Sequence, residues 1–282
     1  MIRIVTDSTS DLPLEECRKR GIEQVALSVH FGSESFRDGV DITHAEFYRR
    51  LSAAEELPTT SQLNPDDLVK IFEKYRAQGD EVVGIFLSSD LSGTYQSACI
   101  ARDMAGGEGI WLVDSRSVTF GLGLLVMYAA VLRDGGMGAQ ELAAELEECT
   151  QRLRILAVVD TLKYLKMGGR ISSAAAMVGG ILGVSPIITV EDGKVEAAGK
   201  TRGRKAAFRW MEQKMQEQGV DETLPVAFGH TNCAEAMNEC MEHFSALREK
   251  APFVLTGSIG SVVGTHAGPG AAGVAYFTKK QP

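Results

Sequence analysis

The chain has 282 residues, 44% of them hydrophobic, which is enough for a sizeable core and for two domains. Its formal charge of −8 argues against a nucleic-acid partner, because nucleic-acid backbones attract basic surfaces. No apolar run is long enough to cross a bilayer and the first residues lack a secretion signal, so we expect a cytoplasmic protein. The five cysteines are scattered without metal-binding spacing, so no metal is expected.

The first residues predict a strand followed by a helix, which is typical of the start of an α/β domain. Ile2–Thr6 is expected to form the strand, and Asp11 to cap the helix. Asp7 and Asp11 could be a metal pair, but carboxylates beside Ser and Thr more often cap and brace a loop, which we favour. Further along we expect a strand at Gln24–Phe31 and a helix at Thr43–Ala54.

Residues 59–62, TTSQ, precede a strong helix start at Asn64 and Pro65, and we expect them in an exposed loop. Thr60 and Ser61 belong to this run of hydrogen-bonding side chains. The run could line a binding site, although a solvated loop has the same composition.

The clearest binding signature follows the apolar run Val83–Leu87, which predicts a buried strand. A helix is expected at Thr94–Ala105, and its first N–H groups have no partner within the helix. Ser92 and Thr94 supply hydroxyls before the helix, and Gly93 lets the backbone approach a ligand closely. This combination favours an anion such as a carboxylate or phosphate, whereas the alternative is a serine that only caps the helix.

The alternation of strands and helices continues with a strand at Gly109–Asp114 and helices at Leu122–Arg133 and Ala139–Arg152. This spacing predicts an α/β fold with a doubly wound, mostly parallel sheet. In such sheets ligands collect beyond the carboxyl ends of the strands, where the hydroxyl-rich segments would lie.

The sequence changes character near Arg154, and we predict two domains, residues 1–153 and 154–282. A strand is expected at Ile155–Asp160 and a hairpin at Ile187–Ala197. Residues 160–209 contain nine Lys or Arg and only four acidic residues. This excess marks a candidate docking face for an anionic partner, although a solvated helix would account for part of it.

The last third of the chain places His266 among small residues, in what we expect to be a loop. Histidine is well suited to share a proton with a carboxylate, and the alternative is a structural histidine without a ligand. Residues 268–273 spell G-x-G-x-x-G, but a strand and not a helix is expected next, so we reject a dinucleotide-binding motif. The other expected elements are three strands and a helix: Pro225–His230, Phe253–Thr256, Val274–Thr278 and Ala234–Glu249.

Six separated motifs together resemble the DegV family of bacterial fatty-acid-binding proteins, which includes the FakB subunits of fatty acid kinase. They are VTDSTSDL, TTSQ, LSSDLSGTYQSA, VDS, LKYLKMGGRIS and VVGTHAGPGAAG, and they span nearly the whole chain. The resemblance implies an N-terminal α/β domain, a C-terminal α+β domain and a buried tunnel between them that holds one long-chain fatty acid. It implies no cofactor.

The resemblance also implies roles for particular residues. Thr60, Ser92 and His266 would bind the fatty-acid carboxylate. Loop residues would support them: Ser61, Gly93, Thr94 and Gly268. The protein would be a non-catalytic carrier that presents the carboxyl group to an ATP-dependent fatty acid kinase subunit, with Arg170 and Arg202 near that encounter. Transient contact with a membrane would fit the same role.

Two other functions stay open. A serine-type acyl hydrolase could use Ser92 and His266, although the chain lacks a G-x-S-x-G motif. A lipid-responsive sensor would have the same sequence features as a carrier.

Small residues at Ala174–Ala176 and Gly179–Gly180 are expected to leave room for the acyl tail.

Overall fold

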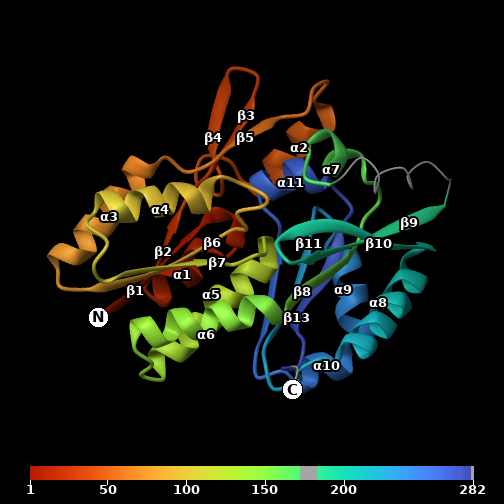
Figure 1. Ribbon diagram of the computed structural model, residues 1–282. Helices are drawn as coiled ribbons and strands as arrows, with labels where there is room; N and C mark the ends of the chain where they lie inside the picture. Colours follow the sequence, from red (N-terminus) through yellow and green to blue (C-terminus); the bar gives the residue numbers. More distant parts are fainter. Residues whose placement is uncertain (172–182, 281–282) are drawn as a thin grey trace.

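The structure is a computed structural model that describes residues 1–171 and 183–280. In these residues the strands form three sheets, with the orders β2-β1-β6-β7, β10-β9-β8-β13-β11-β12 and β4-β3-β5 (Figure 1). The predicted segments 174–176 and 179–180 lie outside the described residues. Across the described ranges, no helix combines the length and the apolar character needed to cross a lipid bilayer.

The first sheet is parallel throughout, as the alternation of strands and helices predicts. Its strands are β1 (Ile2–Asp7), β2 (Ile22–Val25), β6 (Glu81–Phe86) and β7 (Ile110–Asp114). The helices that alternate with them are α1 (Leu14–Lys19), α3 (Pro65–Ala77), α4 (Thr94–Met104), α5 (Thr119–Asp134) and α6 (Ala139–Arg152). Helix α5 is apolar on nearly every side because it packs against strands of both large sheets.

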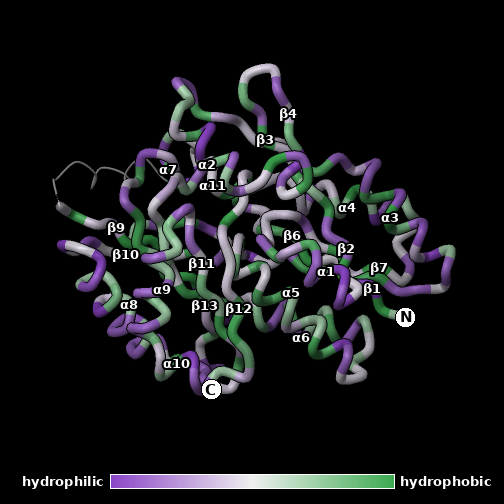
Figure 2. Tube along the Cα trace, turned by 180° about the vertical axis from the view of Figure 1, so that it is seen from behind, coloured by the Kyte–Doolittle hydropathy of each residue, from purple (hydrophilic) through white to green (hydrophobic). Residues whose placement is uncertain are grey.

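The second sheet is antiparallel except for the parallel pair β11 and β12. Its strands are β8 (Leu153–Val158), β9 (Val184–Glu191), β10 (Lys194–Arg202), β11 (Val226–His230), β12 (Val254–Ser258) and β13 (Ala272–Phe277). The helices beside it are α8 (Arg204–Gln218), α9 (Ala234–His243) and α10 (Ser245–Lys250). Figure 2 shows hydrophilic residues along the outer helix α8. The predicted domain boundary after residue 153 stays a prediction. Strand β8 of the second sheet begins at Leu153, one residue before the predicted second domain.

The third sheet is small and antiparallel, and it projects at the top of Figure 1. It contains β3 (Ser28–Phe31), β4 (Glu34–Arg37) and β5 (Thr59–Ser61). Beside it lie three helices: α2 (His44–Ala53), α7 (Lys163–Met167) and α11 (Ser261–Ala267). Helix α11 contacts α2, α7, β3 and β5, so this sheet is joined to the C-terminal part of the chain.

The structure corrects the prediction of one strand at Gln24–Phe31. Strands β2 and β3 belong to different sheets, and Ala26 and Leu27 separate them. The Leu27 side chain is buried, its N–H donates to Ser8 Oγ, and its carbonyl accepts from Asp38 N. The helix predicted at Ala234–Glu249 is likewise two helices, which meet at the buried Phe244.

Two predictions about loops and caps were also wrong. TTSQ is largely exposed, as expected, but it is not a loop, because residues 59–61 pair with β3 as β5. Asp11 does not cap α1, which begins after Pro13 without a side-chain cap. The Asp11 carboxylate instead accepts hydrogen bonds from Gly260 N and Thr119 Oγ1. Asp7 does brace its loop, since it accepts from Thr9 and from Leu87 N.

Candidate ligand-binding site

A cavity lies between strands β8, β9 and β10 of the second sheet and the segments that follow strands β1, β6 and β7 of the first sheet. It holds about 1040 Å³ of space outside protein atoms, part of it open to solvent. Most of its wall is apolar and comes from both halves of the chain: Leu27, Leu87, Leu91, Val118, Phe120, Ile155, Ala157, Leu165, Ile188, Val190, Val195, Ile259, Val262 and Val263. The lining is that of a site for a small, largely apolar molecule.

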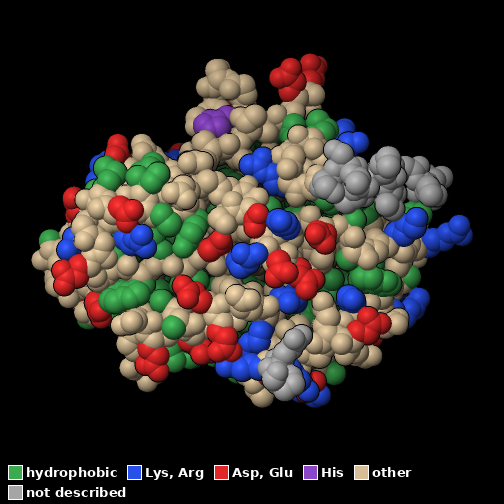
Figure 3. All heavy atoms as spheres, in the orientation of Figure 1, with side chains coloured by type: hydrophobic (Ala, Val, Ile, Leu, Met, Phe, Trp, Pro, Cys, Tyr) green, Lys and Arg blue, Asp and Glu red, His purple; other side chains and the backbone are tan. Residues whose placement is uncertain are grey.

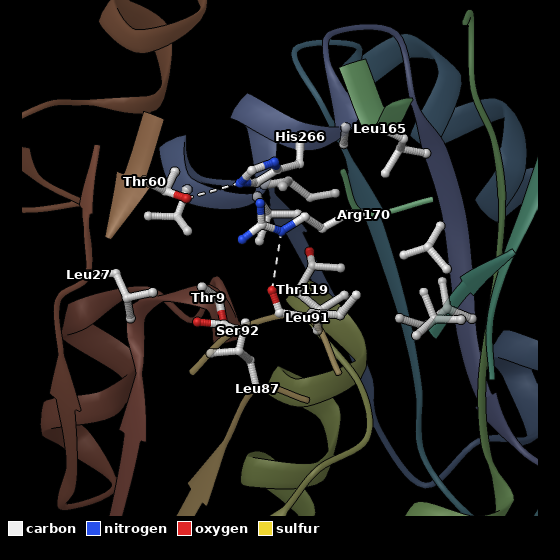
Figure 4. A pocket seen from close by; sticks show the side chains of 18 of the residues that line it. Thr9, Leu27, Thr60, Leu87, Leu91, Ser92, Thr119, Leu165, Arg170 and His266 are labelled. Carbon is white, nitrogen blue, oxygen red and sulfur yellow. Dashed lines mark hydrogen bonds between the residues drawn. The ribbon is translucent and has the colours of Figure 1, made fainter. Parts of the chain in front are cut away.

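Polar side chains gather at one end of this cavity, as Figure 4 shows. Thr60 comes from β5, Ser92 from the loop between β6 and α4, His266 from α11, and Arg170 from the segment after α7. The structure thus brings together four residues that are up to 206 positions apart in the sequence. A ligand with an acidic head group and an apolar tail would match a cavity whose wall is polar at one end and apolar elsewhere.

The imidazole of His266 is oriented by one hydrogen bond and is held uncharged by its surroundings. Its Nε2 lies 3.0 Å from Thr60 Oγ1. Its Nδ1 is buried and has no hydrogen-bond partner among the described residues. Burial, and then the charge of Arg170, lower the pKa of His266 from 6.5 to about 4. The residue lies in helix α11, whereas the sequence predicts a loop there.

Ser92 lies just before helix α4, and Gly93 at the N-cap of this helix lines the same cavity. Ser92 Oγ lies 3.1 Å from Thr94 Oγ1 and accepts a hydrogen bond of 3.3 Å from Thr94 N. Gly93 occupies the N-cap position without a side-chain cap, so the helix N-terminus remains able to bind an acceptor. Ser61 and Gly93 line the cavity, whereas Thr94 is buried behind Ser92.

Arg170 lines the cavity, but Arg202 does not. The Arg170 guanidinium donates to the carbonyls of Leu91 (3.2 Å) and Gly168 (2.6 Å), so it braces the loop that carries Ser92. Arg202 is exposed at the end of β10. Gly268 ends α11 with a φ of 70°, which an L side chain rarely adopts.

Three other cavity residues were given no individual role from the sequence, although Gln62 belongs to the TTSQ run that could line a binding site. Thr9, Gln62 and Thr119 also line the wall. Thr9 follows β1 and Thr119 begins α5, so their places beyond strand ends in hydroxyl-rich segments were a usable signal. Gln62 is the last residue of TTSQ, and its amide donates to Ser97 Oγ.

An α/β fold around a cavity with one polar end defines a protein with an internal ligand site. The family model described as "Uncharacterised protein, DegV family" matches residues 1–279. A DegV domain-containing protein from Caldanaerobacter subterraneus is 41% identical over 280 residues, which cover 99% of each chain. The chain belongs to the DegV family, which confirms the resemblance seen in its motifs.

Solved structures match the fold over the same length. A DegV family protein from Thermus thermophilus, described by its fatty acid binding, has a TM-score of 0.91 at 31% identity, covering 99% of both chains. A stearic acid-binding protein from Eubacterium ventriosum has a TM-score of 0.87 at 29% identity, again with 99% of both chains covered. These matches confirm the predicted α/β fold class.

Proposed function

We propose that this protein binds one long-chain fatty acid, with its carboxylate at the polar end of the cavity and its acyl chain along the apolar wall. The observation that carries the proposal is the division of one cavity into a polar end, with Thr60, Ser92 and His266, and an apolar remainder. The fatty acid binding described for the Thermus thermophilus protein and the stearic acid binding described for the Eubacterium ventriosum protein support it.

The polar end suits a carboxylate without a lysine buried beside it. Hydroxyls and the N-terminus of α4 can donate hydrogen bonds to the head group, and each bond to a charged group contributes about 1.5–3 kcal/mol. The imidazole of His266 is uncharged at neutral pH, so it acts as a hydrogen-bond partner. Arg170 supplies a positive charge at the cavity wall.

The acyl chain supplies most of the affinity in this proposal. Each methylene removed from water contributes about 0.8 kcal/mol. The apolar wall accepts such a chain without any polar partner, whereas an ionic ligand lacking a tail would leave that wall empty. A medium-length or long acid is therefore expected to bind far more tightly than acetate.

Native mass spectrometry of the purified protein, followed by solvent extraction, tests this function. We expect one fatty acid per chain, and its identity gives the chain length and unsaturation. A protein that stays empty after incubation with a panel of fatty acids would contradict the proposal. Acetate and an alkane of matched length are the controls for head group and tail.

We further propose that the carrier has no chemistry of its own and presents the carboxyl group to an ATP-dependent fatty acid kinase subunit. Ser92 Oγ contacts Thr94 and His266 contacts Thr60, so the contacts do not pair a serine nucleophile with a histidine base. Arg170 at the cavity and the exposed Arg202 would face the kinase. Transient contact with a membrane would be a route for loading the acid.

The kinase role is tested by adding a kinase subunit and ATP to the loaded protein and measuring acyl phosphate. Arg202→Ala should keep fatty acid binding and lower acyl phosphate formation, because Arg202 lies outside the cavity. Figure 3 shows basic and acidic side chains interspersed over the middle of one face of the molecule. Binding without any acyl phosphate would favour a lipid sensor, and turnover of acyl esters would favour a hydrolase.

A further inference from the structure

Helix α11 is too short to set the position of His266 by itself. It has seven residues, from Ser261 to Ala267, and isolated helices of that length are unstable in water. Ser261 and His266 are five residues apart, which corresponds to about 7.5 Å along a helix axis. The direction of the imidazole therefore depends on the contacts that hold the first turn of this helix.

Two carboxylates from the first 40 residues hold that turn. Asp38 Oδ1 accepts hydrogen bonds from Ser261 N (2.8 Å) and Ser261 Oγ (2.6 Å). Asp11 Oδ1 accepts one from Gly260 N (2.8 Å). Carboxylates near the N-terminus of a helix satisfy its free N–H groups and oppose its dipole. The helix that carries His266 is thus fixed by a distant part of the chain.

The arrangement is tight and electrostatically costly. A Cβ atom at Gly260 would lie 2.9 Å from one oxygen of each carboxylate, so only glycine lets both approach the backbone. Burial, and then the charge of Asp38, raise the pKa of Asp11 well above its usual range. A single serine or asparagine would cap a helix without this cost. The paired carboxylates therefore suggest a demand for exact placement of the helix and not only for its formation.

The same carboxylate also connects α11 to the cavity wall. Asp11 Oδ2 accepts a hydrogen bond of 2.6 Å from Thr119 Oγ1, and Thr119 lines the cavity at the start of α5. Tyr48 of α2 donates to the carbonyl of Ile259, just before α11. The segment before α11 is thus held by side chains from three other parts of the fold.

We propose that Asp11 and Asp38 are positioning residues for the head-group site, which fix helix α11 and so aim His266 at Thr60. Neither residue is assigned contact with the ligand. The inference rests on the proposed function where it concerns fatty acid affinity, but the position of His266 can be measured without any ligand.

The first test follows His266 in delipidated protein by NMR titration of isotope-labelled histidines. Asp38→Ala removes the acceptor for Ser261, so water should reach the imidazole and the pKa of His266 should rise from about 4 by about one unit or more. Asp38→Asn keeps an acceptor oxygen and should stay near the wild-type value. The matched control is Asp80→Ala, which removes a similarly buried carboxylate that binds Met1 and Arg3 and should leave His266 unchanged.

The second test compares a fatty acid with the fatty alcohol of the same chain length. Asp38→Ala should lower the preference for the acid roughly tenfold and leave the affinity for the alcohol unchanged, since only the acid needs a well-placed His266. An equal loss for both ligands would overturn the proposal, because it would indicate a purely structural role.

An unchanged His266 titration in Asp38→Ala would also overturn it. If Asp38→Ala does not fold, the His266 titration is repeated in Ser261→Ala, which removes only one of the two hydrogen bonds to Asp38. A raised pKa of His266 then supports the proposal, and an unchanged pKa overturns it. A wild-type protein that binds neither acid nor alcohol would contradict the proposed function, while the titration would still accept or reject the positioning role.

Discussion

The head-group end of the cavity depends on an uncharged histidine. His266 is half-buried beside Arg170, and both effects disfavour a second positive charge there. The Arg170 guanidinium is itself bonded to two backbone carbonyls, at Leu91 and Gly168. A bound carboxylate would therefore meet hydroxyls, helix N–H groups and a neutral imidazole together with one arginine that is already held in place. Such a site can hold an acid without the desolvation cost of a fully buried ion pair.

The neutral state of His266 predicts how stability depends on pH. Its pKa is about 4 in the folded protein and near 6.5 when unfolded, so the unfolded chain binds more protons between these values. This contribution to the free energy of unfolding is complete above pH 6.5 and is lost as the pH falls toward 4. Between pH 7 and pH 5 the wild type should lose roughly 2 kcal/mol more than His266→Asn, measured by urea unfolding. Equal losses in the two proteins would refute the assignment.

The two hydroxyls at the polar end predict a loss of affinity on truncation. Thr60→Val and Ser92→Ala each remove a donor, and each should weaken fatty acid binding by about 1–3 kcal/mol, measured by isothermal titration calorimetry. Ser89→Ala is the control, because Ser89 lies in the same loop but bonds to Asp114 and does not line the cavity. Wild-type affinity in both cavity variants would show that the head group lies elsewhere.

At the scale of elements, the local sequence predicted those strands, helices and turns whose formation depends mainly on neighbouring residues. The buried strand β6, the helix α4 after it and the hairpin turn at Asp192-Gly193 follow from apolar periodicity and turn chemistry. Strand β5 could not be read in this way, because its partner β3 lies about 30 residues earlier and only that pairing orders it. Local sequence likewise did not show that Asp11 binds Gly260, 249 positions away.

The packing of α11 on α2 predicts that one methyl group will disturb the site. A Cβ atom at Gly264 would lie 2.7 Å from both Phe47 Cε1 and Tyr48 Oη, and both side chains are almost fully buried. Gly264→Ala should therefore lower the free energy of unfolding by about 1–3 kcal/mol, measured by chemical denaturation. Adding Phe47→Leu should restore part of that loss by making room, and wild-type stability of Gly264→Ala alone would contradict the packing.

The cavity belongs to the whole molecule, because its wall combines strands of the second sheet with segments that follow strands of the first sheet. The hairpin of β9 and β10 contributes Ile188, Val190 and Val195 to the wall. Its tip reaches the other half of the chain, where Ser88 Oγ donates to Gly193 O (2.8 Å) and the Arg116 guanidinium donates to Asp192 O (2.6 Å). These contacts hold one wall of the cavity against the loop that leads to Ser92.

Loosening this tip should speed the exchange of a bound fatty acid without altering its head-group contacts. Ser88 is fully buried, so Ser88→Ala leaves the Gly193 carbonyl without its donor and should raise the dissociation rate about tenfold, as about 1.4 kcal/mol would. Stopped-flow displacement of a fluorescent fatty acid measures the rate. The control is Ser115→Ala, which removes an equally buried serine hydroxyl that bonds within its own loop. Equal release rates in the two variants would mean that the hairpin tip does not limit escape from the cavity.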